Sequence, residues 1–417
     1  FMFVLYDESK QRKSIKIWLN NKEEVEEACL EQAMNLANLP FVHKWVSLMP
    51  DTHAGYGMPI GGVLATTDVI IPNAVGVDIG CGMAFIQANI PAELLRNTET
   101  PNGILAQAII GNVLRNVPVG FAKHNQMQDS ITLADMDTDL SWDAQKAKYP
   151  ELAEQCFPNA WYQIGTLGGG NHFIELQADE NDHVAIMIHS GSRNLGKQVA
   201  DFFNKKAVEL NKQWYSDVPA EWKLPFLPVN SEIGQDYIKW MQLAMDFAKE
   251  NRDKMMQQTK SVLYNMVKKY TGFTGIEESL SVNAHHNYAA IEHHYGKNVW
   301  VHRKGAIRAR KGELGIVPGA MGSYSYIVEG LGNEESFMSC SHGAGRKMSR
   351  KKAREEFPVE QTIVDLKEQG VYLGKHNKAD VSEESRFAYK DIDAVIENEL
   401  DLIKPIKKLK TVAVIKG

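Results

Sequence analysis

His172-Phe173-Ile174-Glu175-Leu176-Gln177 and His183-Val184-Ala185-Ile186-Met187-Ile188-His189 are two apolar runs joined by the polar segment Asp179-Glu180-Asn181-Asp182. Runs of this length and composition are typical of strands, and the segment between them is typical of a turn. A turn centred on the middle of that segment would place His172 directly opposite His189 in an antiparallel hairpin. Directly opposed residues have Cβ atoms about 4.5–5.5 Å apart, so the two imidazoles could bind one metal ion or two adjacent ions.

The loops that flank this hairpin decide between two interpretations of the histidine pair. A cross-strand pair in an arbitrary hairpin most often lies on the surface without a ligand. Here the first strand follows Gly168-Gly169-Gly170-Asn171, and the second leads into Ser190-Gly191-Ser192-Arg193 and a predicted helix start. Such loops can offer backbone N–H groups to an anion, which favours a binding site.

The length of 417 residues exceeds the usual size of one hydrophobic core and allows two or three domains. However, the chain contains no low-complexity linker, internal repeat or hinge rich in Pro, Gly and Ser. We therefore expect one interwoven catalytic domain over residues 1–417, with a helix-rich segment at about residues 193–270. Hydrophobic patterning predicts helices at 24–39, within 92–113 and at 235–270, and strands at 63–66, 69–71 and 75–77. This mixture predicts an α+β fold without regular βαβ alternation.

Charge and cysteine content restrict the environment of the protein. The net charge of -6 gives no overall indication of nucleic acid, so any RNA or phosphate site must be local. The four cysteines form no CxxC pair, which argues against a disulfide framework and against a cysteine-based zinc site. A reducing cytoplasm is the predicted location. The first apolar run is too short for a signal peptide and no run approaches membrane-spanning length, so no membrane partner is expected.

A second candidate metal segment is Gly76-Val77-Asp78-Ile79-Gly80-Cys81-Gly82. Its glycines let the backbone turn sharply enough for the Asp78 carboxylate and the Cys81 thiolate to point into one space. His286, in His285-His286-Asn287, is a further candidate ligand. Carboxylate, thiolate and imidazole together admit Zn²⁺, Mn²⁺, Fe²⁺ or Co²⁺, and ligand type alone does not choose among them. We expect Cys29 and Cys156, in contrast, to be small buried hydrophobic residues without a ligand role.

His342 lies in the small-residue loop Ser339-Cys340-Ser341-His342-Gly343-Ala344-Gly345-Arg346, before a predicted helix at residues 347–357. A loop of this kind at a helix amino terminus can bind an anion. Arg346, Lys347 and Arg350 add positive charge that would stabilise a phosphate and disfavour protonation of the imidazole. A neutral imidazole beside a phosphate can act as a nucleophile, but phosphate binding and proton transfer remain equally compatible with these residues.

The remaining histidines and basic stretches carry less specific signals. We assign ordinary structural roles to His43, His124, His183 and His376, and we expect His293-His294 on a solvated helix face. The basic stretches at residues 302–311 and 346–354 are either solvated surface or, beside a phosphate site, contact surfaces for a polyanion.

Several longer motifs follow one another along the chain. They are Met49-Pro50-Asp51-Thr52-His53-Ala54-Gly55-Tyr56-Gly57, Val75-Gly76-Val77-Asp78-Ile79-Gly80-Cys81-Gly82-Met83, Gly170-Asn171-His172-Phe173-Ile174-Glu175, His189-Ser190-Gly191-Ser192-Arg193, His285-His286-Asn287-Tyr288, Leu331-Gly332-Asn333-Glu334-Glu335-Ser336, Ser341-His342-Gly343-Ala344-Gly345-Arg346 and Lys416-Gly417. In these motifs the chain resembles the RNA-splicing ligase RtcB family along essentially its whole length. The resemblance implies a distinctive α+β fold. It also implies a ligase that uses GTP and Mn²⁺ to join an RNA 3′-phosphate, or 2′,3′-cyclic phosphate, to a 5′-hydroxyl end.

Carried over position by position, the resemblance gives the candidate metal ligands paired roles. Cys81 would bridge two Mn²⁺ ions, with His189 and His286 completing one site and Asp78 and His172 the other.

The same resemblance makes His342 the nucleophile, which would attack the GTP α-phosphate and form a histidine-GMP phosphoramidate. GMP would then pass to the RNA 3′-phosphate. The 5′-hydroxyl would attack that activated phosphate and release GMP.

The resemblance also implies a nucleotide site and RNA contacts. The residues matched to the nucleotide site are Asn171, Phe173, Glu175, Pro318, Gly319, Ala320, Met321, Gly322, Gly343, Ala344, Gly345, Tyr389 and Lys416. Among them Tyr389 would stack on the guanine, Lys416 would contact its edge, and the segment around Gly319 would line the phosphates. Ala320 stands where many relatives carry Ser, which removes one hydroxyl contact to the nucleotide. The candidate RNA contacts are Arg193, Arg303, Arg308, Arg346 and Arg350.

Two alternative functions use the same residues. A dimetal phosphoesterase would activate water with the Asp, Cys and His cluster, without a protein-GMP adduct and without a need for His342. A nonenzymatic RNA-binding protein would keep the metal as a structural clamp and show no turnover. Cys81 and His342, each intact in its full motif, argue against both. The sequence does not specify the physiological RNA, the oligomeric state or a dependence on an accessory activating protein.

Overall fold

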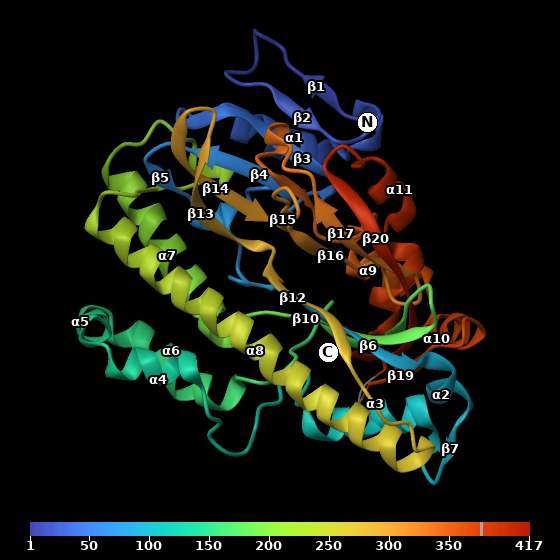
Figure 1. Ribbon diagram of the computed structural model, residues 1–417. Helices are drawn as coiled ribbons and strands as arrows, with labels where there is room; N and C mark the ends of the chain where they lie inside the picture. The colour runs from blue at the N-terminus through green and yellow to red at the C-terminus, as the bar shows by residue number, and fades with distance from the viewer. Residues whose placement is uncertain (376–377) are drawn as a thin grey trace.

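The computed structural model describes residues 1–375 and 378–417 and confirms the predicted α+β class (Figure 1). Most strands of the described residues belong to two large sheets, of six and eight strands. His376, to which the sequence assigns a structural role, lies outside the described residues.

The six-stranded sheet has the order β1 (Phe3–Leu5), β2 (Ile15–Ile17), β3 (Val42–His53), β4 (Ile60–Thr66), β14 (Lys297–Lys304) and β13 (Asn287–His294). Its neighbouring strands are antiparallel except β2 and β3. Helix α1 (Glu27–Ala37) buries Cys29 and Leu36 against this sheet. The predictions of a helix near residues 24–39 and of a strand at 63–66 are therefore confirmed.

The eight-stranded sheet contains the two apolar runs at residues 173–177 and 183–189. Its order is β12 (Glu278–His285), β6 (Gly82–Pro91), β10 (His183–Ser190), β9 (Phe173–Ala178), β20 (Ile403–Lys416), β17 (Tyr324–Gly330) and β16 (Leu314–Val317), with β19 (Tyr372–Gly374) parallel to β20. One face packs Ile186 and Ile188 with helices α3 (Leu105–Asn116) and α8 (Glu232–Thr271), and the other packs Ala185 and Met187 with Leu366. Because both faces of β10 are covered, this strand is an almost continuous apolar run.

Eleven α-helices surround the sheets in the described residues. Beyond α1 they are α2 (Ala92–Asn97), α3 (Leu105–Asn116), α4 (Ile131–Thr138), α5 (Leu140–Lys148), α6 (Pro150–Gln163), α7 (Arg193–Gln213), α8 (Glu232–Thr271), α9 (Arg350–Glu356), α10 (Val359–Glu368) and α11 (Ile392–Glu397). The minor strand pairs are β5 (Val69–Ile70) with β11 (Leu227–Pro228), β7 (Glu99–Thr100) with β8 (Gly103–Ile104), and β15 (Ala306–Arg308) with β18 (Ser339–Ser341). None of the described helices combines the length and the apolar character needed to cross a membrane.

Helix α8, with 40 residues, runs diagonally across the molecule with α4, α5 and α6 along one side (Figure 1). It begins where the Ser231 hydroxyl accepts a hydrogen bond from the Gly234 N–H (3.1 Å) and ends at Gly272, whose φ of 70° is left-handed. Its first half packs in one hydrophobic core with Trp240 and Phe247, and its second half packs in another with Met255 and Leu263. The helix predicted at 235–270 is therefore confirmed, and this helix spans two cores.

The predicted register of the β9–β10 hairpin is wrong by one residue. His189 pairs with Phe173, and His172 lies just before β9 instead of opposite His189. The Asp179 N–H donates to the carbonyl of His183 (2.9 Å), which leaves a three-residue loop ending in Asp182 with φ 58°. In a loop with an odd number of residues, the centre of the turn lies on one residue instead of between two residues, and this moves each cross-strand pair by one position. A left-handed last residue is typical of three-residue hairpin loops.

Two other local predictions are also wrong, and a third is wrong only in where its helix begins. Residues 75–77 form no strand, because the 3₁₀ turn Pro72–Ala74 leads straight into the loop before Cys81. His293 and His294 belong to β13 instead of a solvated helix, and His294 is buried between the carboxylates of Glu292 (3.0 Å) and Glu334 (2.7 Å). The helix predicted at 347–357 begins only at Arg350, where the Ser349 hydroxyl caps it.

Candidate active site

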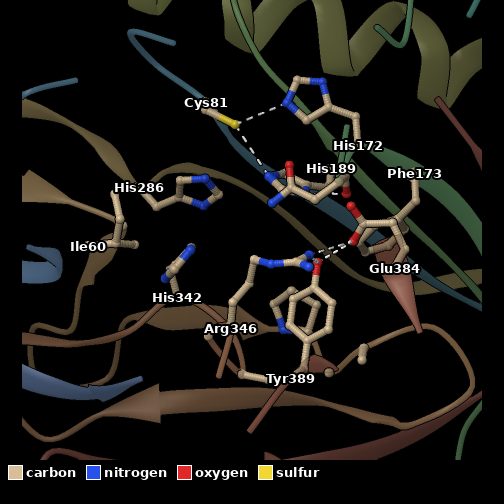
Figure 2. Close-up of a pocket in the computed structure, with 18 of the residues that line it drawn as sticks. Ile60, Cys81, His172, Phe173, His189, His286, His342, Arg346, Glu384 and Tyr389 are labelled. Atoms are coloured by element: carbon tan, nitrogen blue, oxygen red, sulfur yellow. Dashed lines mark hydrogen bonds and ion pairs between the residues drawn. The ribbon is translucent and has the colours of Figure 1, made fainter. Parts of the chain in front are cut away.

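One cavity of about 310 Å³ collects most of the predicted site residues (Figure 2). Its wall is built by the loop before β6, the start of β9, the end of β10, the turn between β12 and β13, and the loop after β18. Residues from these segments are separated by up to several hundred positions in the sequence. The paired strands β6, β9, β10 and β12 bring them to the same end of one sheet.

A cluster of metal-binding side chains lies on one side of this cavity. The Cys81 Sγ is 3.3 Å from the Nε2 of His189 and 3.5 Å from the Nε2 of His172, as the dashed lines of Figure 2 show. The Nε2 of His172 is 3.2 Å from the Asp78 carboxylate. Two groups of three donor atoms, each within 4.8 Å of one another, share Cys81: one adds His189 and His286, the other Asp78 and His172.

Hydrogen bonds to the other ring nitrogens fix how these imidazoles point. The Nδ1 of His172 bonds the Leu167 carbonyl (2.9 Å), and the Nδ1 of His189 bonds the Asn171 carbonyl (3.1 Å). Both backbone contacts direct the Nε2 atoms toward Cys81, as is usual for imidazoles that ligate a metal. The Nδ1 of His286 is buried and has no hydrogen-bond partner among the described residues. An orphaned nitrogen beside a thiol and two further imidazoles fits a transition-metal ion.

The electrostatics of the cluster favour neutral imidazoles at His189 and His286 and an ionised carboxylate at Asp78. Burial, together with neighbouring cationic groups, holds the pKa of His189 and of His286 well below its ordinary value. Burial opposes ionisation of Asp78, but the hydrogen bond from His172 and the N–H of Ser192 lower the pKa of that carboxyl. Burial and the Asp78 charge raise the pKa of the Cys81 thiol. Deprotonation of this thiol therefore needs a nearby cation, which a metal ion would supply.

The loop after β18 brings His342 to the opposite side of the same cavity. Its ring centroid lies 4.8 Å from that of His286. Its Nδ1 is 2.6 Å from a carboxylate oxygen of Asp51, a fully buried residue of β3. A carboxylate on Nδ1 sets the tautomer in which Nδ1 carries the proton and the Nε2 lone pair is free.

The remaining part of the cavity combines aromatic, acidic and basic side chains. The Tyr389 hydroxyl bonds the Glu384 carboxylate and accepts a hydrogen bond from Arg346 (3.2 Å). Lys416, the last residue of β20, places its ammonium 5.4 Å from the centre of the Phe173 ring. Phe173 and Lys416 are directly paired residues of β9 and β20.

Two ionisable groups in this part have displaced pKa values. Burial raises the pKa of Glu175 to about 7, although hydrogen bonds from Thr411 and Gln177 oppose the shift. Burial lowers the pKa of Lys416, although the nearby Glu384 and Glu175 favour its charged form.

Comparison with known proteins assigns this arrangement to a family. The family model described as tRNA-splicing ligase RtcB matches residues 32–417. The chain belongs to the RtcB family.

Curated relatives share this membership over nearly their whole length. The chain is 38% identical to the RNA-splicing ligase RtcB of Escherichia coli K12, with 97% of each chain covered. It is 30% identical to the tRNA-splicing ligase RtcB of Nanoarchaeum equitans, with 100% of this chain and 98% of the relative covered. It is also 30% identical to the RNA-splicing ligase RtcB of Mycobacterium bovis over 93% of this chain and 100% of the relative. The chain is thus an enzyme of a ligase family.

Within this RtcB family member, nearly all residues predicted for the nucleotide site line the cavity. They are Asn171, Phe173, Glu175, Pro318, Gly319, Ala320, Met321, Gly343, Ala344, Gly345, Tyr389 and Lys416. Gly322 is the exception, because it lines a neighbouring hollow on the other side of Tyr389.

The predicted RNA contacts divide into two groups. Arg346 and Arg350 line the cavity, and Arg350 is exposed. The prediction for Arg303 is wrong, because its guanidinium is fully buried and forms a bidentate pair with Glu292 (2.6 and 3.0 Å). His302, Arg303 and Lys304, the first three residues of the basic stretch 302–311, are all buried within β14.

The two other arginines lie away from the cavity wall. Arg308 pairs with Glu313 (2.7 Å) and Arg193 bonds Thr166 (3.2 Å) beneath the glycine loop.

The sequence predicts no role for five residues that line the cavity: His53, Ile60, Asn287, Gly305 and Glu384. It also predicts none for Asp51, which bonds the ring of His342. Asp51, His53 and Asn287 do stand in motifs shared with the RtcB family, so the motifs carried a signal for them. Glu384 lies outside every motif, and only the fold brings it to Tyr389.

Proposed function

We propose that this RtcB family member is a GTP- and Mn²⁺-dependent RNA ligase that joins 3′-phosphate or 2′,3′-cyclic phosphate ends to 5′-hydroxyl ends in RNA splicing or repair. The observation that carries the proposal is the position of His342. Its imidazole is held by Asp51 at 2.6 Å and lies beside His286 of the metal cluster, at 4.8 Å between ring centroids. A nucleophile and a metal cluster that share one cavity are the parts that nucleotidyl transfer needs.

The first step forms a covalent histidine-GMP. The Nε2 lone pair of His342 attacks the α-phosphorus of GTP, a new N–P bond forms, and the bond from that phosphorus to the bridging oxygen breaks. Pyrophosphate leaves with the electron pair of the broken bond. The Nδ1 proton stays on the ring, hydrogen-bonded to the Asp51 carboxylate, and this carboxylate stabilises the positive charge that develops on the imidazole.

The second and third steps use the stored GMP. An oxygen of the RNA 3′-phosphate attacks the phosphorus of the adduct, and the N–P bond breaks, which returns a neutral His342. The 5′-hydroxyl of the second RNA end then attacks the activated 3′-phosphate. A phosphodiester bond forms, the 5′-hydroxyl proton is lost to a base, and GMP departs.

The residues that would hold two Mn²⁺ ions are Asp78, Cys81, His172, His189 and His286, with Cys81 shared between both groups. Bound there, the ions would supply positive charge that screens the phosphates during nucleophilic attack. The mixture of hard and soft donors is compatible with Mn²⁺ and does not select it, so the metal identity follows from the resemblance to the family.

Guanine recognition is proposed for the part of the cavity around Glu175, Tyr389 and Lys416. A buried carboxyl and a buried ammonium can hydrogen-bond the edge of a base, and the half-buried Tyr389 ring offers a stacking surface. Ala320 lacks a hydroxyl, so the backbone of the segment around Gly319 would make the phosphate contacts there.

RNA would approach over Arg346 and Arg350, which are positioned at the cavity and can pair with phosphates. We further propose that residues 1–417 act as one catalytic domain and that the protein works in the cytoplasm, where its four free thiols would stay reduced. An accessory activating protein would be a further partner.

The experiment that tests the proposal is incubation with α-labelled GTP and Mn²⁺, followed by a denaturing gel and acid treatment. Wild type and His124→Ala, a histidine outside the cavity, should carry an acid-labile label, and His342→Ala should carry none. Absence of label on metal-replete wild type would remove the ligase mechanism and favour the phosphoesterase alternative. A label that survives in His342→Ala would place the nucleophile elsewhere.

A further inference from the structure

Two adjacent polar residues inside helix α8, Asn251 and Arg252, are fully buried. They lie between the two hydrophobic cores that α8 joins, near Phe247 on one side and Met255 on the other. A buried amide and a buried guanidinium are costly unless every polar atom has a partner. Their partners are therefore informative about what this part of the helix does.

The guanidinium of Arg252 contacts three segments that carry metal ligands. Its Nη1 donates to the carbonyl of Gly80 (2.8 Å), which precedes Cys81, and to the carbonyl of Ser190 (3.0 Å), which follows His189. Its Nη2 contacts the Nδ1 of His285 (3.0 Å), next to His286, and its Nε donates to Asn283 on the same strand (2.8 Å). One side chain thus contacts the backbone beside Cys81 and His189, and two side chains of the strand that leads to His286.

The side chain of Asn251 contacts the segments that position the other two ligands. Its Oδ1 accepts hydrogen bonds from the N–H groups of Gly165 (2.6 Å) and Thr166 (3.0 Å), and its Nδ2 donates to the carbonyl of Thr166 (3.0 Å). The next residue, Leu167, is the one whose carbonyl bonds the Nδ1 of His172 (2.9 Å).

The same Nδ2 also donates to the Gly191 carbonyl (3.1 Å) and to the Ser190 hydroxyl (3.3 Å). Gly191 lies directly against Asp78, since a Cβ at this position would be 2.2 Å from the carboxylate oxygens. Asn251 is therefore linked to the surroundings of both His172 and Asp78.

We propose that Asn251 and Arg252 are positioning residues that hold the ligand segments of both metal groups in register with one another. The inference rests on the proposed metal-binding function of the cluster. Each residue acts through backbone groups and side chains of the segments that carry the ligands, and none of its hydrogen bonds is to a metal ligand side chain. Because Arg252 reaches the Cys81, His189 and His286 segments while Asn251 reaches the His172 and Asp78 surroundings, the pair connects the two groups through one rigid helix.

The charge of Arg252 is consistent with this arrangement. No carboxylate lies within hydrogen-bonding distance of its guanidinium in the described part of the chain, and burial lowers its pKa to about 10. The Cys81 sulfur, once ionised, and the Asp78 carboxylate favour the charged form of this guanidinium. A planar group with donors in three directions is needed to bond three separate segments at once, which a lysine ammonium at the end of a flexible stem cannot reproduce.

The test is direct measurement of Mn²⁺ binding by the full chain, with free Mn²⁺ followed by its electron paramagnetic resonance signal. The variants are Arg252→Lys, Arg252→Met and Asn251→Ala, and thermal unfolding without metal reports the stability of each. Loss of contacts that orient metal ligands typically weakens metal affinity by about 10–100-fold, and we expect a weakening in that range for all three. Arg252→Lys should not restore affinity, because the bonds and not the charge alone position the segments.

Asp236→Asn provides the matched control. Asp236 is a buried polar residue on the same helix, and its carboxylate is bonded by Lys148, Tyr149 and Gln145, away from the cavity. This variant should lose thermal stability without losing Mn²⁺ affinity.

The outcomes separate this proposal from the one on which it rests. If wild type takes up no Mn²⁺, the proposed metal function fails. If wild type binds Mn²⁺, and Asn251→Ala and Arg252→Lys bind it as tightly as Asp236→Asn does, the positioning role is overturned. Arg252→Lys and Asn251→Ala keep the test valid if Arg252→Met does not fold.

Discussion

At the level of single residues, the pair formed by Asp51 and His342 determines which nitrogen is available for chemistry. The two residues are separated by 291 positions and meet at 2.6 Å. One carboxylate oxygen bonds the ring, and the other, Oδ1, is buried without a partner among the described residues. The hydrogen-bond partner of the Asp51 carboxylate is therefore His342.

Asp51→Asn should slow formation of histidine-GMP by roughly 100-fold or more, because the variant keeps the shape but loses the charge that stabilises the developing imidazolium. The measurement is the single-turnover rate of labelling with α-labelled GTP. Asp401→Asn, which affects a carboxylate bonded to Trp18 (3.0 Å) away from the cavity, is the control. Labelling of Asp51→Asn at the wild-type rate would contradict a role of this contact in catalysis.

Glu175 gives a pH-dependent prediction, since burial raises the pKa of its carboxyl from 4.5 to about 7. Between these two pH values the folded chain retains a proton that the unfolded chain releases. The free energy of unfolding of wild type should therefore fall relative to Glu175→Gln as the pH rises from about 4.5 to about 7.

Thermal unfolding of Glu175→Gln and wild type at pH 5 and pH 7.5, without nucleotide, checks this sign. The advantage of the Gln variant should be larger at the higher pH. An equal difference at both pH values would mean that Glu175 is ionised throughout this range in the folded chain.

At the level of elements, the backbone conformation of a glycine decides whether an alanine at that position stabilises or destabilises the protein. Gly272 ends this helix with φ 70°, and no atom lies within 4 Å of a Cβ added there. Gly111 lies instead inside α3, where the nearest atom to an added Cβ is 3.8 Å away. The same substitution should therefore have opposite effects at the two positions.

Gly272→Ala should destabilise the protein by about 1 kcal/mol, because a side chain disfavours the left-handed conformation. Gly111→Ala should stabilise it by about 1 kcal/mol, because alanine is the better helix former. Midpoints of urea denaturation for both variants test the pair. A shift in the same direction at both positions would show that side-chain contacts, and not backbone conformation, dominate.

At the level of the whole molecule, the metal cluster joins segments from residues 78 to 286 at one end of the eight-stranded sheet. A ligand that binds only the folded arrangement stabilises the fold by mass action. Metal binding should therefore raise the stability of the whole chain and not only of the loops beside it.

Mn²⁺ at about 100 times its dissociation constant should stabilise wild type by about 2.7 kcal/mol per site, and Cys81→Ser should lose most of this gain. Cys156→Ser is the matched control, because Cys156 is also a buried free thiol but lies on α6, in a hydrophobic core away from the cavity. Unfolding temperatures with and without Mn²⁺ give the comparison. Equal stabilisation of both variants would exclude Cys81 as a ligand.

Much of the site could be predicted from the sequence because metal and phosphate chemistry leaves short motifs. Asp78, Cys81, His172, His189 and His342 each stand in or next to a segment with glycine or serine residues, and the structure brings these five and His286 to one cavity. The long amphipathic pattern of α8 and the apolar runs of β9 and β10 were also readable, since local periodicity encodes helices and strands.

Only the tertiary structure decided what depends on distant segments meeting. The Asp51–His342 contact, the partners of Asn251 and Arg252, and the burial of Arg303 against Glu292 all follow from how the two sheets and α8 pack. The hairpin register was missed because one left-handed residue, Asp182, shifts every pairing by one position. The sequence thus determined the fold class and the kinds of ligand this protein presents, through local residue patterns. The packed structure decided which side chains meet and which charges are buried, because those properties arise from contacts between residues far apart in the chain.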